Sequence, residues 1–525
     1  MTEALSAAEN FAAAACEVVR ARVAASSLDA EQHAAHGLAW IETAVEALRA
    51  LEAWGAKQTG EAEALVVAIG TGETLAQLAG GLPMGQNEFV RPADFELNDH
   101  VPALLAAAKG NTPENRAALV ALLREGAQIS DRMDDHFLDQ VRDQYRRFTD
   151  DRILPHAHQW HLDNALIPDE IISEMAALGT FGVCVSEEYG GLGLGKLVMC
   201  VVTEELSRGW IGTGSLGTRS EIAGELISLG GTDAQKAHWL PKIASGEVLP
   251  TAVFTEPDTG SDMASLQTRA TQNIGGWEIT GAKTWITHAA RTDLMTLMAR
   301  TLPTVKGYAG LSMLLVPKPR GSEDNPFPAD GMSGSEIEVL GYRGMREYAL
   351  QFDAMQAPDD ALLGGEQGQG FKQLMRTFEG ARIQTAARAV GVARRAFELA
   401  LAYALDRKQF GQPIINFPRV GDKLAMMVTD IIMARELTYF AARAKDSGKR
   451  CDIEAGMAKL LAARVAWANA DASLQIHGGN GYALEYEISR VLCDARILNI
   501  FEGAAEIQAQ VIARGTLQAK TQDEN

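Results

Sequence analysis

One carboxylate near the end of the chain, Glu502, stands where acid–base chemistry could take place. It follows the apolar run 497–501 and precedes Gly503, after which Ile507 and Ile512 recur at helical spacing. Glu502 is therefore expected where a loop becomes a helix. A carboxylate that faces an apolar cavity has a raised pKa and can act as a base on a weak carbon acid. The plainer interpretation is an acidic residue that stabilises the start of a helix through its dipole.

The spacing of apolar residues predicts the elements around Glu502. Helical spacing in 371–405, 420–444 and 452–476, with a last helix running past Glu502, predicts a four-helix bundle. Short β-type runs between Thr251 and Pro358, separated by Gly and Pro, predict an antiparallel β domain. The expected domains are an extra N-terminal helical module (1–130), a helical domain (131–250), an antiparallel β domain (251–365) and a C-terminal helical bundle domain (366–525).

Composition excludes several classes of function. The net charge of −20 disfavours a nucleic-acid partner, because phosphate binding needs a basic footprint. No apolar run is long enough to span a bilayer, so membrane insertion is not expected. The five cysteines are odd in number and form no CxxC spacing, which indicates reduced thiols. With no targeting signal in Met-Thr-Glu-Ala-Leu, we expect a cytoplasmic protein.

The N-terminal module is acidic and lacks any motif that could do chemistry. Up to Ser130 it holds 17 acidic and 8 basic residues, and its Ala, Leu and Glu content favours helices. Pro and Gly residues between Gly80 and Pro92 should interrupt those helices. A role in packing or assembly is the expectation.

Two other patterns are weak signals for a cofactor or a metal. The glycines of 188–195 do not have G-x-G-x-x-G spacing and follow no β-rich run, so a dinucleotide site is not expected there. His156, His158 and His161 lack acidic or cysteine partners in a recognisable pattern, so they predict a solvated helix face and no metal.

Four motifs, in order, resemble the acyl-CoA dehydrogenase flavoprotein family. They are Phe254-Thr-Glu-Pro-Asp-Thr-Gly-Ser-Asp262, Gly281-Ala-Lys-Thr-Trp-Ile-Thr287, Arg407-Lys-Gln-Phe-Gly411, and Gln475-Ile-His-Gly-Gly-Asn-Gly-Tyr482 followed by Phe501-Glu-Gly503. The resemblance covers about residues 131–514. It implies an α+β fold, with a helical domain, a middle β domain and a C-terminal four-helix bundle, to which this chain adds its N-terminal module.

The resemblance also implies FAD as cofactor. Residues near the flavin ring and its pyrophosphate would be Phe254, Thr255, Gly260, Ser261, Trp285 and Thr287. A second group resembles the segments that reach the FAD of a neighbouring subunit, which implies a homodimer: Arg407, Gln409, Phe410, Gln475, Gly478 and Gly479. Ala504 departs from the family, which usually has a cofactor-binding Thr at this position.

By the same resemblance, Glu502 takes the α-proton of an acyl-CoA while a β-hydride passes to the flavin N5. The Glu502 backbone amide and a ribityl hydroxyl would polarise the thioester oxygen, and Ser261 and Gly503 would also contact substrate. Some relatives carry the base at the position of Ala381, which strengthens the case for Glu502. Electrons would leave to an electron-transferring flavoprotein.

The added N-terminal module resembles a subgroup that desaturates a short branched dicarboxylyl-CoA. A distal carboxylate needs a buried cation, and Arg219 and Arg382 are the candidates. Arg219 could instead be a surface residue paired with Glu221 or Glu225. A short monocarboxylic acyl-CoA, an acyl-CoA oxidase reaction, and a flavin-carrying binding protein without dehydrogenase activity remain alternatives. The module is also expected to cover a surface that relatives use to pair dimers into tetramers.

Overall fold

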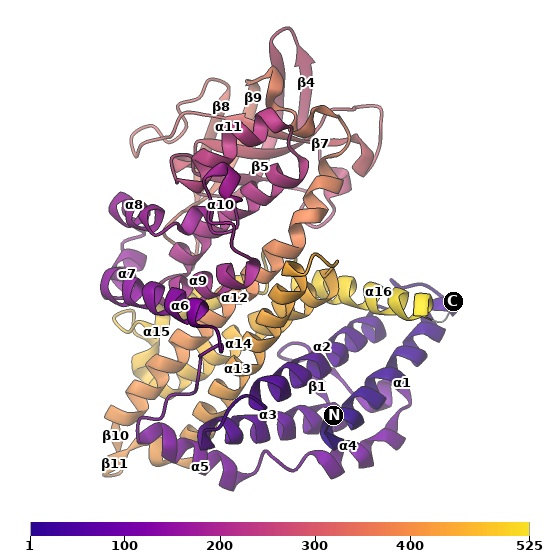
Figure 1. The fold of residues 1–525 in the computed structure, drawn as a ribbon, viewed down its shortest axis with the longest axis vertical. Helices are drawn as coiled ribbons and strands as arrows, with labels where there is room; N and C mark the ends of the chain where they lie inside the picture. The colour runs from indigo at the N-terminus through magenta and orange to yellow at the C-terminus, as the bar shows by residue number, and fades with distance from the viewer. Residues whose placement is uncertain (1, 524–525) are drawn as a thin grey trace. The chain divides into compact units, whose positions relative to one another are not determined.

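The computed structural model describes residues 2–523, which form two compact units (Figure 1). Residues up to 143 and from 385 onward make the first unit, and residues 144–384 make the second. The long helix α12 (Gly370–Asp406) begins in the second unit and ends in the first. Within the described part of the chain, no helix has the length and apolar character needed to cross a membrane.

The N-terminal module of the first unit is built from helices and one hairpin. Its helices are α1 (Glu3–Ala25), α2 (Gln32–Gly55), α3 (Glu61–Gly80), α4 (Val101–Ala107) and α5 (Pro113–Arg124). Thr2 and Thr112 cap α1 and α5 through their side chains. The predicted interruption is present, since α3 ends at Gly80 and β1 (Leu82–Pro83) pairs with β2 (Phe89–Val90).

The rest of the first unit is the C-terminal bundle. After α12 come α13 (Pro418–Asp446), α14 (Asp452–His477), α15 (Ile488–Ile497) and α16 (Ala505–Asp523). Module helices α2, α3 and α5 pack on α13, and α2 also packs on α14 and α16, as Figure 1 shows. Gly70 permits this approach, because a Cβ there would lie 3.1 Å from Thr429 Cγ2. The module thus covers the apolar face of the bundle.

The second unit joins helices to a seven-stranded sheet. The helices include α7 (Leu154–Leu162), α8 (Asp169–Ala177), α9 (Lys196–Gly209), α10 (Ile211–Gly230) and α11 (Asp233–Ala244), and α6 (His136–Phe148) leads in from the first unit. The strands are β3 (Pro250–Val253), β4 (Arg269–Asn273), β5 (Gly276–Thr287), β6 (Leu294–Arg300), β7 (Leu311–Pro317), β8 (Met332–Ile337) and β9 (Glu347–Pro358).

The sequence predicts an antiparallel sheet, but the observed sheet is mixed. Its order is β3-β6-β4-β5-β9-β8, with β7 paired to β6. Strand β3 runs parallel to β6, which the long connection through β4 and β5 permits, and β4 also pairs with β6 in parallel. Trp277, Ile279, Leu297 and Phe352 are buried in its core.

Candidate active site

Glu502 lies in the loop between α15 and α16, three residues before α16 begins, as the sequence predicted. Its backbone is in the left-handed region (φ 53°), and so is that of Gly503 (φ 88°). A left-handed conformation is unfavourable for a non-glycine residue and persists only where the surroundings enforce it. The direction of the Glu502 side chain is therefore set by the contacts that hold this loop.

Two buried polar side chains hold the loop. Lys459, on α14 and fully buried, donates from Nζ to the Gly503 carbonyl oxygen at 2.7 Å. Gln508, on α16, donates from Nε2 to the carbonyl oxygens of Glu502 and Gly503, each at 3.2 Å. Because the two donors come from different helices, the loop is fixed against both.

The Glu502 carboxylate points to α12. Its Oε2 atom lies 2.6 Å from Arg388 Nη2 and accepts a second hydrogen bond from the Thr385 hydroxyl. Arg388 Nη2 also donates to Thr385 Oγ1 at 2.8 Å, and the guanidinium lies 5.0 Å from the centre of the Phe501 ring. Thr385 and Arg388 are three residues apart, so they share one face of α12.

The surroundings of Glu502 are thus not simply apolar. The side chain of Glu502 is 15% exposed, while that of Arg388 is fully buried. A charge-assisted hydrogen bond to a buried guanidinium is strong and orients the carboxylate. Sequence reasoning missed Thr385, Arg388 and Lys459. The available signal for Arg388 was a charged residue inside the apolar run Thr-Ala-Ala-Arg-Ala-Val of a helix expected to be buried.

In the second unit, a buried ion pair joins the first two motifs. Lys283 Nζ lies 3.0 Å from Glu256 Oε1 and donates to the Phe254 carbonyl oxygen at 2.8 Å. Burial lowers the pKa of Lys283 to about 8, against the opposing attraction of Glu256. Burial would raise the pKa of Glu256, but Lys283 and the backbone N–H groups of Gln267 and Thr268 outweigh it and lower that pKa.

This pair places the predicted flavin residues of the two motifs next to each other. The Thr284 N–H also donates to the Thr255 carbonyl oxygen at 2.9 Å. The Trp285 side chain is exposed (56%, φ 58°), and Gly260 and Ser261 are exposed as well. An exposed indole suits stacking on an aromatic ring, and a glycine open to solvent lets a phosphate approach the backbone. These residues fit a flavin nucleotide.

Arg219, on α10, is a buried cation. It is 9% exposed, and its Nη2 atom donates to the Tyr342 hydroxyl at 3.0 Å. Burial raises the pKa of the nearby Glu347 to about 7, although the Thr287 hydroxyl and Arg219 act in the opposite direction. The interpretation of Arg219 as a surface residue is wrong.

Two acidic residues close to Arg219 on α10 form ion pairs with a lysine. Glu221 and Glu225 contact the Lys196 ammonium, with Glu225 at 2.8 Å. The second predicted substrate cation, Arg382, is half-buried on α12, and its guanidinium lies 5.8 Å from the Phe378 ring centre.

The residues predicted to reach a neighbouring subunit are exposed on the first unit. Arg407 follows α12, and Gln409 and Phe410 lie in the hairpin of β10 (Lys408–Gln409) and β11 (Gln412–Pro413). Gln475 lies in the last turn of α14, and Gly478 (φ 60°) and Gly479 begin the turn that follows.

Stacking and a hydrogen bond join the end of α12 to the turn that follows α14. Tyr403 stacks on His477 at 4.3 Å between ring centres, and Asn480 Nδ2 donates to the Tyr403 hydroxyl at 3.0 Å. Phe410 is 93% exposed with φ 51°, so a large apolar ring is presented to solvent in an unfavourable conformation.

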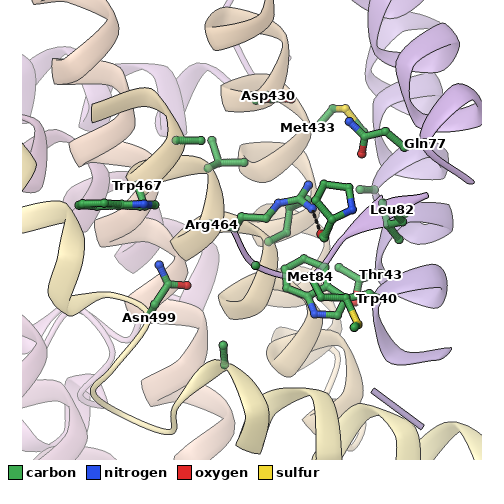
Figure 2. A pocket seen from close by; sticks show the side chains of 18 of the residues that line it. Trp40, Thr43, Gln77, Leu82, Met84, Asp430, Met433, Arg464, Trp467 and Asn499 are labelled. Atoms are coloured by element: carbon green, nitrogen blue, oxygen red, sulfur yellow. Dashed lines mark hydrogen bonds between the residues drawn. The ribbon is translucent and has the colours of Figure 1, made fainter. Parts of the chain in front are cut away.

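A separate cavity of about 630 Å³ lies where the module meets the bundle (Figure 2). Arg464 reaches into it from α14, donates to the Pro83 carbonyl oxygen at 2.6 Å and lies 4.8 Å from the Trp40 ring centre. Burial raises the pKa of Asp430, in the cavity wall, to about 6. Neither Glu502 nor Arg388 lines this cavity, so it is not the candidate active site.

Comparisons with known proteins identify the family to which the chain is similar. Models of the acyl-CoA dehydrogenase N-terminal, middle and C-terminal domains match residues 137–247, 251–355 and 368–517. The chain is 59% identical to (2S)-methylsuccinyl-CoA dehydrogenase of Cereibacter sphaeroides, over 94% of this chain and 92% of that protein.

Solved structures of similar proteins have the same fold over most of this chain. A glutaryl-CoA dehydrogenase–glutaryl-CoA complex is 31% identical, covers 74% of this chain and 97% of that one, and gives a TM-score of 0.69. The structure described as PigA with FAD and proline is 25% identical, covers 74% of this chain and 99% of that one, and gives 0.67. The expected order of a helical domain, a middle β domain and a C-terminal helical domain is confirmed, and so is the resemblance to the family.

Proposed function

The chain belongs to the acyl-CoA dehydrogenase family, and we propose that it is an FAD-dependent oxidoreductase that converts (2S)-methylsuccinyl-CoA to mesaconyl-CoA. The proposed substrate rests on how much of the chain is aligned at 59% identity. The family models begin at residue 137, whereas the match to the Cereibacter enzyme spans 94% of the chain and so includes most of the N-terminal module. Relatedness that extends through this module supports the same substrate.

Glu502 is the proposed base. It removes the α-proton of the thioester, and its loop geometry, enforced by Lys459 and Gln508, fixes the position of the accepting oxygen. The Glu502 backbone N–H is the proposed donor to the thioester oxygen, with Ser261 and Gly503 beside the substrate. A dry site strengthens both interactions.

FAD supplies the acceptor for the β-hydride when it is bound. The residues proposed to hold it are Phe254, Thr255, Gly260, Ser261, Trp285 and Thr287. The exposed groups around Arg407, Gln409, Phe410, Gln475, Gly478 and Gly479 would contact the FAD of a second subunit, so a homodimer completes each site. An electron-transferring flavoprotein is the proposed electron acceptor.

The test is anaerobic bleaching of the flavin absorbance by a panel of saturated acyl-CoA thioesters, with wild type and Glu502→Gln side by side. Methylsuccinyl-CoA should bleach the wild type fastest, and the variant should lose at least a thousandfold in rate because no base remains. Faster bleaching by butyryl-CoA or isobutyryl-CoA would overturn the substrate proposal. Rapid aerobic peroxide formation would indicate an oxidase, and no bleaching by any thioester would overturn dehydrogenation itself.

A further inference from the structure

We propose that Glu347 is a positioning residue for the redox step. It sets whether the Thr287 hydroxyl donates or accepts a hydrogen bond at the flavin, and it takes up a proton from solvent when the flavin is reduced. This inference rests on the function proposed above, through its FAD and the place of Thr287 beside it, but not on the identity of the substrate.

Glu347 and Thr287 face each other across two strands of the sheet. They are directly paired residues of the antiparallel strands β9 and β5, so their side chains lie on the same face. The Thr287 hydroxyl donates to Glu347 Oε2 at 3.1 Å, and the two residues are only 8% and 6% exposed. A β-branched residue in place of Glu347 would pair with Thr287 without burying an acid, so the carboxyl calls for a functional reason.

The backbone around this pair is held in unfavourable conformations. Trp285 and His288, on the two sides of Thr287, have φ of 58° and 65°, and Arg346, immediately before Glu347, has φ of 63°. The His288 N–H donates to the Arg346 carbonyl oxygen at 2.9 Å, which ties the two strand ends together. Left-handed non-glycine residues persist only where the surroundings enforce them, and they concentrate at functional sites.

Glu347 can change its charge near neutral pH. Its Oε1 atom is buried and accepts no hydrogen bond from the part of the chain that the structure describes. A buried carboxylate that lacks partners favours its neutral form. Burial accordingly raises the pKa of Glu347 to about 7, against the opposing effects of Thr287 and Arg219. A change in a nearby charge is then enough to make Glu347 bind or release a proton.

Other charged or titratable side chains near Glu347 come from α10, from β8 and from the segments that flank β5 and β9: Arg219, Glu336, His288, Tyr342 and Arg346. Arg219 and Arg346 keep their charge, because a guanidinium is not deprotonated in proteins. Arg346 forms an ion pair with the exposed Glu336 at 3.5 Å. Burial and nearby cations lower the pKa of His288 to about 3, so it stays neutral. Glu347 is thus the buried carboxyl that can exchange a proton here.

Charge balance gives the direction of that exchange. A hydride brings two electrons and one proton, so reduction leaves one more negative charge beside Thr287. A carboxylate close to this charge is repelled, its pKa rises further, and it binds a proton from solvent. The summed charge of the flavin ring and Glu347 is then the same before and after reduction. The α-proton of the substrate goes separately to Glu502.

The Thr287 hydroxyl transmits the same change. It has one proton to donate and two lone pairs that accept. An ionised Glu347 can only accept, so it holds that proton, and Thr287 presents lone pairs to the ring. A protonated Glu347 donates to Thr287 Oγ1 and leaves the hydroxyl proton for the ring. Because a donor stabilises negative charge, protonation of Glu347 favours the reduced flavin both directly and through Thr287.

The pH dependence of the flavin midpoint potential tests this role without any substrate. FAD-loaded wild type and Glu347→Gln are titrated anaerobically in a spectroelectrochemical cell between about pH 5 and pH 8. The variant should bind about one proton per electron pair and wild type up to about two, so the potential of wild type should fall up to twice as steeply with pH. Equal slopes in the two proteins would overturn the proposal.

Infrared difference spectra identify the proton directly. On reduction, wild type should gain the C=O stretching band of a protonated carboxyl, and Glu347→Gln should not. Glu278→Gln is the matched control, because Glu278 lies on β5 with Thr287 but is exposed. It should keep the slope and the band of wild type. A band that is gained equally in Glu347→Gln would assign the proton to another carboxyl and overturn the proposal.

A double-mutant cycle tests the part played by Thr287. Glu347→Gln should raise the potential above pH 7, and this increase should be at least twofold smaller in a Thr287→Val background. An undiminished increase would show that Glu347 acts by charge alone and would overturn the role of the hydroxyl.

These outcomes can be told apart from a failure of the proposed function. If wild type binds no flavin, the proposed function fails. If wild type binds flavin and oxidises methylsuccinyl-CoA but has the same slope as Glu347→Gln, only the role of Glu347 is wrong. A Glu347→Gln variant that cannot retain FAD would show that Glu347 holds the cofactor, and would also overturn this inference.

Discussion

The ammonium group of Lys459 lies 2.7 Å from the carbonyl oxygen of Gly503, the residue after the proposed base. Lys459 is fully buried on α14, and this charged donor reaches the loop that holds Glu502 in a left-handed conformation. The helix that carries Lys459 is thereby coupled to the position of the base.

Replacement of Lys459 should therefore impair catalysis more than substrate binding. Lys459→Met removes the donor to Gly503 and leaves a methionine of similar length in the bundle. We expect kcat to fall at least tenfold with KM changed less than threefold, because a base displaced by about 1 Å loses much of its rate. Steady-state kinetics with methylsuccinyl-CoA measures this.

The exposed Lys449, in the turn before α14, provides the control for that measurement. Lys449→Met should leave kcat unchanged. If Lys459→Met retains the wild-type kcat, the loop does not depend on this hydrogen bond.

Glu347 gives a pH dependence of stability whose sign is fixed. Burial raises its pKa from 4.5 to about 7 in the folded protein. The stability gained from the bound proton is complete below the unfolded value of 4.5 and is lost as pH rises through about 7. The Tm of Glu347→Gln minus the Tm of wild type should therefore increase from pH 5 to pH 8. The expected increase is a few degrees, for a free-energy difference of roughly 2–3 kcal/mol.

Differential scanning fluorimetry of the two proteins at each pH provides the comparison. The difference between them is the measured quantity, because other groups titrate in both. His288, for example, has a pKa lowered to about 3 by burial and by nearby cations. Parallel pH profiles for wild type and Glu347→Gln would show that the Glu347 carboxyl does not titrate in this range.

Much of the fold can be predicted from the sequence, and the errors of that prediction have physical causes. The helix expected over 371–405 is α12 (Gly370–Asp406), because a long stretch with one apolar face is a strong signal. The β-type runs in the sequence do not include the segments that form strands β4 and β8. Both are largely exposed and polar, as in Arg-Ala-Thr-Gln-Asn (269–273), so they lack the apolar alternation that marks a strand.

The candidate site was predicted less completely than the fold. The position of Glu502 before a helix came from local spacing, but Arg388 lies 114 residues earlier in the chain. Only the three-dimensional packing of α12 against the loop brings the two together. Likewise, the burial of Arg219 depends on Tyr342, which no local pattern connects to it.

Phe410 should be required for assembly and for cofactor retention. Its ring is 93% exposed on the hairpin that is proposed to reach a second subunit. Phe410→Asp should weaken the dimer and lower the FAD content, because a charge cannot enter an apolar contact without a partner.

Sedimentation of wild type should give twice 56.4 kDa, since the module is expected to cover the surface used for tetramers.

The matched control for Phe410 is the exposed Ile274, at the β4–β5 turn, and Ile274→Asp should sediment as wild type does. A wild-type tetramer would contradict the role expected of the module. A Phe410→Asp dimer with full FAD content would contradict the proposed contact between subunits.

Arg464 should anchor the hairpin of the N-terminal module to the bundle. Its guanidinium donates to the Pro83 carbonyl oxygen and lies over the Trp40 ring (Figure 2). Arg464→Ala removes both contacts and leaves Asp430 with less of the opposing charge that restrains its raised pKa. We expect hydrogen exchange in residues 82–90 to accelerate at least tenfold, because a lost charge-assisted hydrogen bond costs about 1.5–3 kcal/mol. Arg464→Lys keeps the charge but loses the planar stacking, so it should give an intermediate rate. Exchange in this hairpin that is equal in all three proteins would show that other contacts, such as those around Gly70, hold the module in place.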